Sequence, residues 1–182
     1  MSLSSNKRTT GGVVVIAVWL IYTYSAFAYF VNQKLITFDQ NQVLSNVSTT
    51  QLAEYLHEIG VNLGADSSTN KETLIHFSDP NCQCQTTSTE HVTDLNTTAQ
   101  QQGFNVVTVD TSLWQGPLNL IPSVPSVAII GEQGDFVYYG PYGEGLACSE
   151  TNGYAQTILS NYLKGFNAQL VVSDAKGCYC NI

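Results

Sequence analysis

The hydrophobic and polar positions divide this chain into one long uncharged run and a later series of short patterned segments. The run from Val13 to Val31 contains no charged side chain. At 1.5 Å per residue, a helix of this length measures about 28 Å, which is enough to cross the hydrocarbon core of a bilayer. The pattern predicts a transmembrane helix at residues 13–31, preceded by a short N-terminal segment of residues 1–12.

The charges around this run predict its orientation. Lys7 and Arg8 precede it, so residues 1–12 are expected in the cytosol and the rest of the chain outside it. The alternative is a cleaved signal peptide, since Ala26-Phe27-Ala28 has the small-x-small form of a cleavage site. The apolar run continues to Val31, and its length favours a single-pass anchor in the inner (cytoplasmic) membrane. Both interpretations export the remaining domain, which we expect in the periplasm.

The patterning after the anchor predicts an α/β domain at residues 49–182, separated from the membrane by a polar, irregular spacer at residues 32–48. The segment Ser48-Thr49-Thr50 is a candidate cap for a helix at Gln51–Ile59, where apolar residues recur at helical spacing. The other predicted elements, in chain order, are a strand at 72–77, a helix from Pro80 to Gly103, strands at 104–110, 126–130 and 135–139, and a helix at 154–163.

The order of these elements restricts the topology. A strand–helix–strand unit gives a parallel pair, and the tight turn at Gly131–Gly134 gives an antiparallel hairpin. The sequence therefore predicts a mixed sheet with helices packed on it.

Candidate chemistry lies where the first of these strands meets its helix. Cys82 and Cys84 follow that strand, and Asp79 and Pro80 are typical of a helix N-cap and first helical position. Cys82 is thus expected in the first helical turn, where the helix dipole favours the reactive thiolate. A second signal is Val124-Pro125, directly before a predicted buried strand, which we expect to contain a cis peptide bond.

Residues 70–165 resemble the thioredoxin-like superfamily. The segment Phe77–Cys82 matches the strand end, turn and first active cysteine of that family, and Val124 and Pro125 match its cis-proline loop. The resemblance implies a thioredoxin-like mixed-sheet sandwich in which Val124 and Pro125 hold an extended substrate. Two features depart from the family: the spacing is Cys-x-Cys, and the tryptophans that flank the family's motif are absent.

A narrower resemblance covers most of the exported part. The motifs Asp79–Cys84, Tyr139–Tyr142, Cys148 and Gly177–Cys180, together with the N-terminal anchor, are similar to an uncharacterised bacterial family of membrane-anchored thioredoxin-like domains. That resemblance brings no known activity with it.

Cys82 and Cys84 are open to three interpretations. As a redox pair, they would close a small ring when oxidised, and strained disulfides are labile. As ligands of copper(I) or zinc, they would act with His76 or His91. His76 alternates with core residues and is expected to be structural, whereas His91 is expected to be solvated. The third interpretation is a set of structural disulfides without catalysis.

The remaining cysteines are Cys148, Cys178 and Cys180, which makes an odd total of five. We expect Cys148 to pair with one of the two tail cysteines and to staple the tail to the domain. The alternative is a mobile tail dithiol that exchanges with Cys82 and Cys84, because chain termini move unless they are tied down.

Charge restricts the partners. All 14 acidic residues follow Phe38, and four lysines oppose them from Asn32 onward. Such a surface repels nucleic acid, which requires a basic footprint.

Together, the anchor, the cysteines and the resemblance lead us to expect a membrane-anchored thiol–disulfide exchange protein, either an oxidoreductase or an isomerase. It would act on thiols or disulfides of exported proteins without a metal or organic cofactor. The alternatives are a copper(I)- or zinc-binding module and a redox-inactive scaffold.

Overall fold

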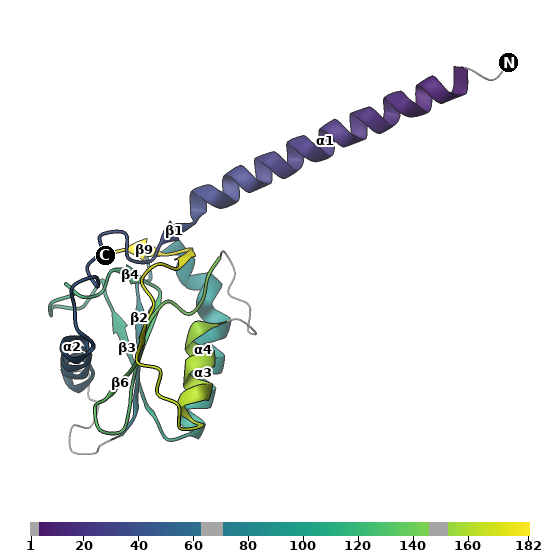
Figure 1. Ribbon diagram of the computed structural model, residues 1–182. Coiled ribbons are helices and arrows are strands. Elements are labelled where there is room, and N and C mark those ends of the chain that lie inside the picture. The colour runs from purple at the N-terminus through teal and green to yellow at the C-terminus, as the bar shows by residue number, and fades with distance from the viewer. Residues whose placement is uncertain (1–3, 63–70, 146–152) are drawn as a thin grey trace. The chain divides into compact units, whose positions relative to one another are not determined.

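The structure is a computed structural model that describes residues 4–62, 71–145 and 153–182. The chain forms two units, Met1–Lys34 and Leu35–Ile182. The first unit is the helix α1, Ser4–Lys34 (Figure 1). Within it, Thr10–Lys34 is long and apolar enough to cross a membrane, and among the described residues it is the one helix that meets this test. The span predicted at residues 13–31 lies inside it.

The second unit is built on a five-stranded mixed sheet in the order β3-β2-β5-β6-β7. Its strands are β2 (Thr73–Ser78), β3 (Asn105–Asp110), β5 (Ser126–Ile130), β6 (Phe136–Gly140) and β7 (Leu170–Val171). The pair β2–β3 is parallel, whereas β5 is antiparallel to both β2 and β6. The predicted parallel pair and the predicted hairpin are both confirmed. The short parallel strand β7 was not predicted.

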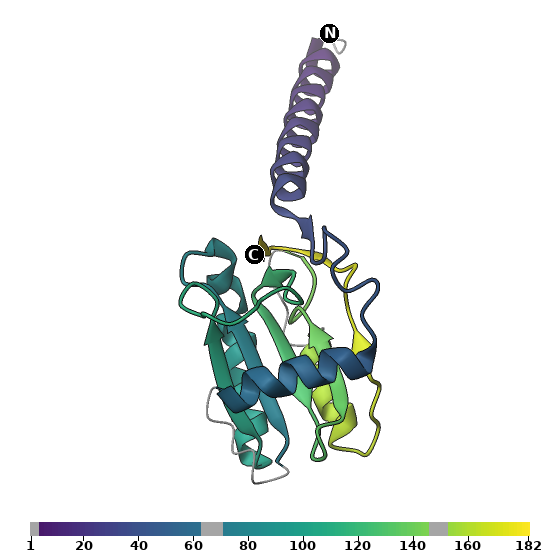
Figure 2. The same ribbon diagram turned by 90° about the vertical axis from the view of Figure 1, so that its left-hand side faces the viewer.

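Helices cover both faces of the sheet. Helix α2 (Thr49–Asn62) crosses one face, and α3 (Thr89–Gln101) and α4 (Tyr154–Tyr162) lie on the other (Figures 1 and 2). The start of α2 is a capping box. The Ser48 hydroxyl accepts a hydrogen bond from the backbone N–H of Gln51 at 3.2 Å, while the Gln51 side chain accepts one from the N–H of Ser48 at 3.1 Å. Of the three candidate capping residues at 48–50, Ser48 is therefore the cap.

The core lies on both faces of the central strands, because β2, β5 and β6 are buried along nearly their whole length. Aromatic rings join the layers at one end. The ring of Tyr139 meets those of Phe77 and Phe38 edge-to-face, at centroid distances of 6.0 and 6.2 Å. Such contacts are typical of aromatic pairs in protein cores.

Phe38 also corrects the prediction of a polar spacer at residues 32–48. Its side chain is fully buried, and its backbone N–H donates to the carbonyl of Ala175 at 2.9 Å. Just before it, β1 (Ile36–Thr37) pairs with β8 (Lys176–Gly177). The apolar residues Ile36 and Phe38 draw this segment onto the domain, so the unit begins at Leu35.

The C-terminal segment forms part of the folded domain. After β8 it continues into β9 (Cys180–Asn181), which pairs with the short strand β4 (Ser123–Val124). Figure 1 shows β4 and β9 together at the end of the sheet where β1 also lies. This arrangement brings the tail cysteines to the end of β2 that leads into Cys82.

Candidate functional site

A tight turn carries the chain from β2 to the first cysteine. The Asp79 carboxylate accepts hydrogen bonds from the backbone N–H of Asn81 at 2.8 Å and from its side-chain amide at 3.0 Å. The N–H of Cys82 donates to the carbonyl of Asp79 at 3.0 Å. Asp79 therefore closes the turn rather than capping a helix, and the predicted N-cap is wrong by three positions.

Cys82 itself is the N-cap residue of the helical run that follows. The run starts as the 3₁₀ helix η1 (Gln83–Ser88) and continues into α3. Hydroxyl groups favour the tight first turns: those of Thr86, Thr87 and Ser88 each donate to the carbonyl three residues earlier, at 2.7–3.0 Å. The Cys82 side chain therefore lies one position before the first turn, still beside the helix N-terminus, and is 4% exposed.

The tail cysteines bond to this pair. Cys82 is joined to Cys180, with an S–S distance of 2.05 Å and a Cα–Cα distance of 5.9 Å. Cys84 is joined to Cys178, with a Cα–Cα distance of 5.3 Å. Both Cα distances are normal for disulfides. The expected Cys82–Cys84 pairing is therefore corrected: the two Cys-x-Cys motifs pair with each other, because β8 and β9 carry the tail past the start of η1.

The partners expected for Cys148 are corrected as well. Both tail cysteines bond to other residues in this structure, so neither is left to pair with Cys148. Cys148 itself lies outside the described residues. The alternative of a tail dithiol that meets Cys82 and Cys84 agrees better with the observed pairing.

The two disulfides form a compact sulfur cluster. The Sγ atoms of Cys82, Cys84 and Cys180 all lie within 4.8 Å of one another. Cys82 and Cys84 are buried, whereas Cys178 and Cys180 are partly buried and hence more accessible to a reagent from solution. An exchange of bonding partners within the cluster would require only small movements of sulfur.

A close aromatic contact fixes the tail in this position. The Tyr179 side chain is 8% exposed, packs edge-to-face on Phe38 and donates to the carbonyl of Gly143 at 2.7 Å. Gly177 allows this packing, because a Cβ atom there would lie 2.5 Å from the Tyr179 ring. The aromatic residue inside Cys-Tyr-Cys is the signal from which an ordered tail could have been predicted.

The loop before β5 lies against Cys82. The Val124–Pro125 peptide bond is cis, as predicted. The carbonyl oxygen of Val124 lies 3.7 Å from the Sγ of Cys82, and Val124 is the residue opposite Cys180 in the β4–β9 pair. The structure thus brings together Cys82, Cys84, Val124, Cys178 and Cys180.

The histidines His76 and His91 bond to other side chains and are not members of the sulfur cluster. His76 is buried, with Nδ1 2.5 Å from the Tyr142 hydroxyl and Nε2 2.6 Å from Oδ1 of Asn96. Since Oδ1 can only accept, Nε2 carries the proton and the tyrosine donates to Nδ1. Burial lowers the pKa of His76, which the hydrogen bond to Asn96 partly offsets. The prediction that His76 is structural agrees with these contacts.

His91 was expected to be solvated, and this is wrong. Its side chain is 1% exposed, and Nδ1 lies 2.8 Å from the amide oxygen of Gln156 on α4. The packing of α4 against α3 covers it. No histidine is among the described residues within the sulfur cluster.

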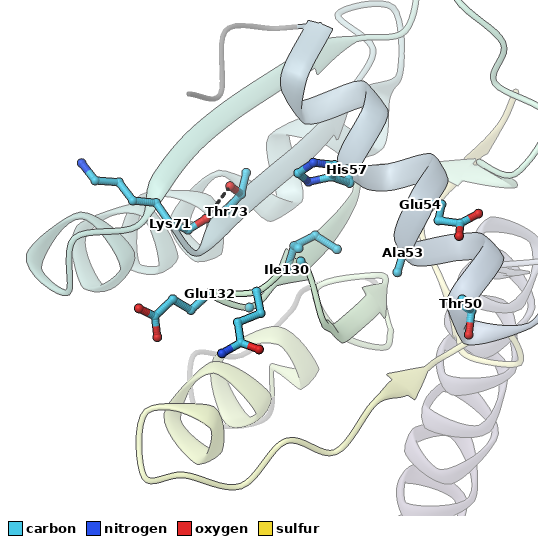
Figure 3. A pocket seen from close by; sticks show the side chains of 11 residues that line it. Thr50, Ala53, Glu54, His57, Lys71, Thr73, Ile130 and Glu132 are labelled. Atoms are coloured by element: carbon cyan, nitrogen blue, oxygen red, sulfur yellow. Dashed lines mark hydrogen bonds between the residues drawn. The ribbon is translucent and has the colours of Figure 1, made fainter. Parts of the chain in front are cut away.

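A pocket of about 360 Å³ lies at the other end of β2, between α2 and the β5–β6 hairpin. His57, Lys71 and Thr73 help to line it. Thr73 is the first residue of β2, whereas Cys82 and Cys84 follow the last residue of that strand, Ser78. In Figure 3 the charged side chains of Glu54, Lys71 and Glu132 point in different directions rather than toward one centre. The pocket therefore takes no part in the cysteine site.

The fold and site define a class: an α/β domain with a candidate membrane helix before it and two disulfides that join a helix start to the C-terminal tail. The chain belongs to the family described as a domain of unknown function (DUF6436), whose model matches residues 46–182. A search of curated proteins finds no match. Among solved structures, the chain is similar to a hypothetical protein from Sinorhizobium meliloti 1021, at 13% identity and a TM-score of 0.45. The similarity covers 63% of this chain and 80% of that one.

Proposed function

We propose that this protein is a membrane-anchored thiol–disulfide exchange protein with a thioredoxin-like fold that acts on exported proteins in the periplasm. The observation that carries the proposal is the cluster of three Sγ atoms within 4.8 Å, in which a buried cysteine bonds to a more accessible one. Exchange requires a thiolate to reach a disulfide sulfur, and this spacing allows it within one protein. The strand order and the cis bond before β5 also agree with a thioredoxin-like fold.

Cys82 is the nucleophile in this proposal. It lies at the N-cap of the helical run 83–101, where the helix dipole stabilises a thiolate. After a thiol reductant has opened the Cys82–Cys180 bond and has itself been oxidised to a disulfide, the Cys82 thiolate attacks a substrate disulfide. One substrate sulfur leaves as a thiolate and takes up a proton, and a mixed disulfide forms on Cys82. Cys180 then attacks the Cys82 sulfur, the substrate is released as a dithiol, and the Cys82–Cys180 bond is restored. The same intermediate serves the reverse direction, in which the protein oxidises a substrate dithiol.

The observed pairing changes the role first expected for Cys84. Because Cys180 is the bonded partner of Cys82, we assign resolution of the mixed disulfide to Cys180. Cys84 is the second thiol within reach. Its bond to Cys178 keeps the tail beside the site while Cys82–Cys180 is open. The carbonyl of Val124 lies against Cys82, and Val124 and the following Pro125 would border the substrate chain.

The test is turnover of a scrambled-disulfide substrate by the full chain in detergent. Cys82→Ala should abolish turnover, and Cys180→Ala should accumulate a mixed disulfide with the substrate on Cys82. The matched comparison removes the other disulfide: Cys84→Ala/Cys178→Ala should turn the substrate over more slowly than the wild type but remain active, because the buried Tyr179 ring still holds the tail beside the site. If Cys82→Ala is as active as the wild type, or if neither is active, the proposal fails.

The same cluster favours one other function, the binding of a soft metal ion. Thiolates select copper(I) and zinc, and a metal–sulfur distance of about 2.3 Å requires ligand sulfurs no more than about 4.6 Å apart. The Sγ atoms of Cys82, Cys84 and Cys180 all lie within 4.8 Å of one another, and reduction of the disulfides would free them as thiols. Anaerobic titration of the reduced protein with copper(I) would reveal this role as one tightly bound ion per chain, lost when Cys82 is replaced by alanine.

A further inference from the structure

The C-terminal segment occupies the edge of β4. Strand β9 lies antiparallel to β4, with Asn181 opposite Ser123 and Cys180 opposite Val124. Among the described residues, β9 is the one strand paired with β4. Without β9, this edge would offer its backbone groups to another extended chain. Figure 2 shows the yellow C-terminal segment running over this end of the sheet.

The two halves of the tail are held differently. The first half is fixed by the buried Tyr179 ring and by the Cys84–Cys178 bond. The second half, residues 180–182, lies at the surface, and Ile182 is 50% exposed. It is held by the two-residue pairing with β4, by hydrogen bonds of the Asn181 side chain and by the Cys82–Cys180 bond. Opening the Cys82–Cys180 bond therefore removes the disulfide that holds residues 180–182, whereas the tail up to Tyr179 stays fixed by its buried ring and by Cys84–Cys178.

We propose that residues 180–182 are an internal stand-in for the substrate, and that an extended, cysteine-bearing segment of an exported polypeptide pairs with β4 in their place. This rests on the proposed function, because the substrate enters after a thiol reductant has reduced Cys82–Cys180 and has itself become a disulfide. Cys82 bonds to the substrate cysteine, whose former sulfur partner leaves and is protonated. When Cys180 attacks Cys82, the tail returns to β4 and the protonated substrate thiol departs. The return of the tail thus couples product release to the second exchange.

The register of the tail defines the substrate. A cysteine opposite Val124 lies beside Cys82, as Cys180 does. The N–H of Ile182, two residues later, donates to the carbonyl of Pro122 at 3.3 Å. Since donors alternate along an antiparallel pair, the N–H of Asn181 points away from β4. The selected class is therefore an extended segment in which the second residue after the cysteine has a free N–H and is not proline.

The experiment uses two full-chain proteins in detergent whose one remaining thiol is Cys82. Both carry Cys84→Ser, Cys148→Ser and Cys178→Ser. One also carries Cys180→Ser and keeps its tail, whereas the other ends after Tyr179. The probe is a peptide copy of residues 176–182 with Cys178→Ser, activated as a mixed disulfide with 5-thio-2-nitrobenzoate. Attack by Cys82 forms the protein–peptide disulfide and releases the coloured thiolate, so the rate is read directly. Cysteamine activated in the same way is the small-molecule control.

We expect removal of residues 180–182 to raise the rate with the peptide by more than the rate with the small disulfide. In the shortened protein, N-methylation of the peptide at the Ile182 position should slow the reaction about two- to tenfold, as expected for one lost hydrogen bond. N-methylation at the Asn181 position should leave the rate unchanged. This peptide comparison uses one protein and so does not depend on how the deletion affects folding.

The outcomes separate the two proposals. Equal effects of the deletion on both reagents, or of N-methylation at both positions, would overturn the docking of a substrate on β4. Cys82 would then still be a reactive thiol that the tail merely covers. If Cys82 in both proteins reacts with either disulfide no faster than free cysteine, the exchange function itself fails, and this inference with it.

Discussion

The two disulfides are nested, and this makes their contributions to stability non-additive. Cys82–Cys180 spans 98 residues and Cys84–Cys178 spans 94. Once one bond is closed, the other closes only the six-residue ring of Cys82–Cys84 and Cys178–Cys180. In the chain-entropy model, a loop of the larger size contributes about 4.7 kcal/mol and a six-residue ring about 2.2 kcal/mol.

The expected changes in unfolding free energy follow from these values. Replacing either bonded pair by two alanines should lower the free energy of unfolding by about 2.2 kcal/mol, because the remaining bond still closes the long loop. Replacing all four cysteines should lower it by about 6.9 kcal/mol, which is more than twice the effect of one pair. The alternative of pairing within each motif closes rings of three residues and predicts a total of only about 3.2 kcal/mol.

The assay is urea unfolding of the full chain in detergent, followed by the fluorescence of Trp114 in a Trp19→Phe background. Each variant is measured both oxidised and after reduction with excess dithiothreitol. The difference between the two isolates the disulfide from the loss of buried sulfur packing. Additive effects of the two pairs, or a total near 3 kcal/mol, would refute the nested pairing between the two Cys-x-Cys motifs.

Three other predictions concern the anchor, the buried histidine and the nucleophile. Alkaline phosphatase fused after Ile182 should be active and remain with membranes; a soluble exported protein that starts at Tyr29 would indicate a cleaved signal instead. Since the pKa of His76 is lowered by burial, the unfolded chain binds its proton more tightly. Stability should therefore be full above pH about 6.5 and fall as the pH drops below it, and His76→Gln should remove this loss in urea unfolding at pH about 7.5 and about 5; equal losses in both proteins would contradict it. In the reduced protein, Cys82 should be alkylated with a pKa below about 8.5 and faster than Cys178, and equal rates would remove the argument from its position at the helix start.

Much of the sheet was predictable because its signals are local. The β-branched run at Asn105–Asp110, the hairpin before Phe136 and the Ser48–Gln51 cap each depend on neighbouring residues. The strands β4, β7, β8 and β9 have two residues each, which is too short for any periodic pattern. They exist because the packed domain provides a partner.

The site was predictable in its residues but not in its connections. Cys82 was predicted as a site residue because it follows a strand and precedes a helix, and the loop at Val124–Pro125 because it directly precedes a buried strand. The pairing of cysteines depends on long-range packing, and four cysteines alone allow three connectivities. The burial of His91 has the same origin, since it is α4 that covers it. The spacing of Cys178-Tyr179-Cys180 gives no sign that this tail reaches the start of η1.

The central claim is that the Cys82–Cys180 disulfide is reversibly reduced and oxidised during function and does not only stabilise the fold. Its most direct test is a redox titration of the full chain in glutathione buffers, with thiols alkylated at each potential and each disulfide quantified by mass spectrometry. Structural disulfides typically have potentials below about −300 mV. We predict a reversible midpoint above that value for Cys82–Cys180 and a lower one for Cys84–Cys178. If Cys82–Cys180 stays oxidised down to about −300 mV, it is a structural bond and the proposed exchange function is contradicted.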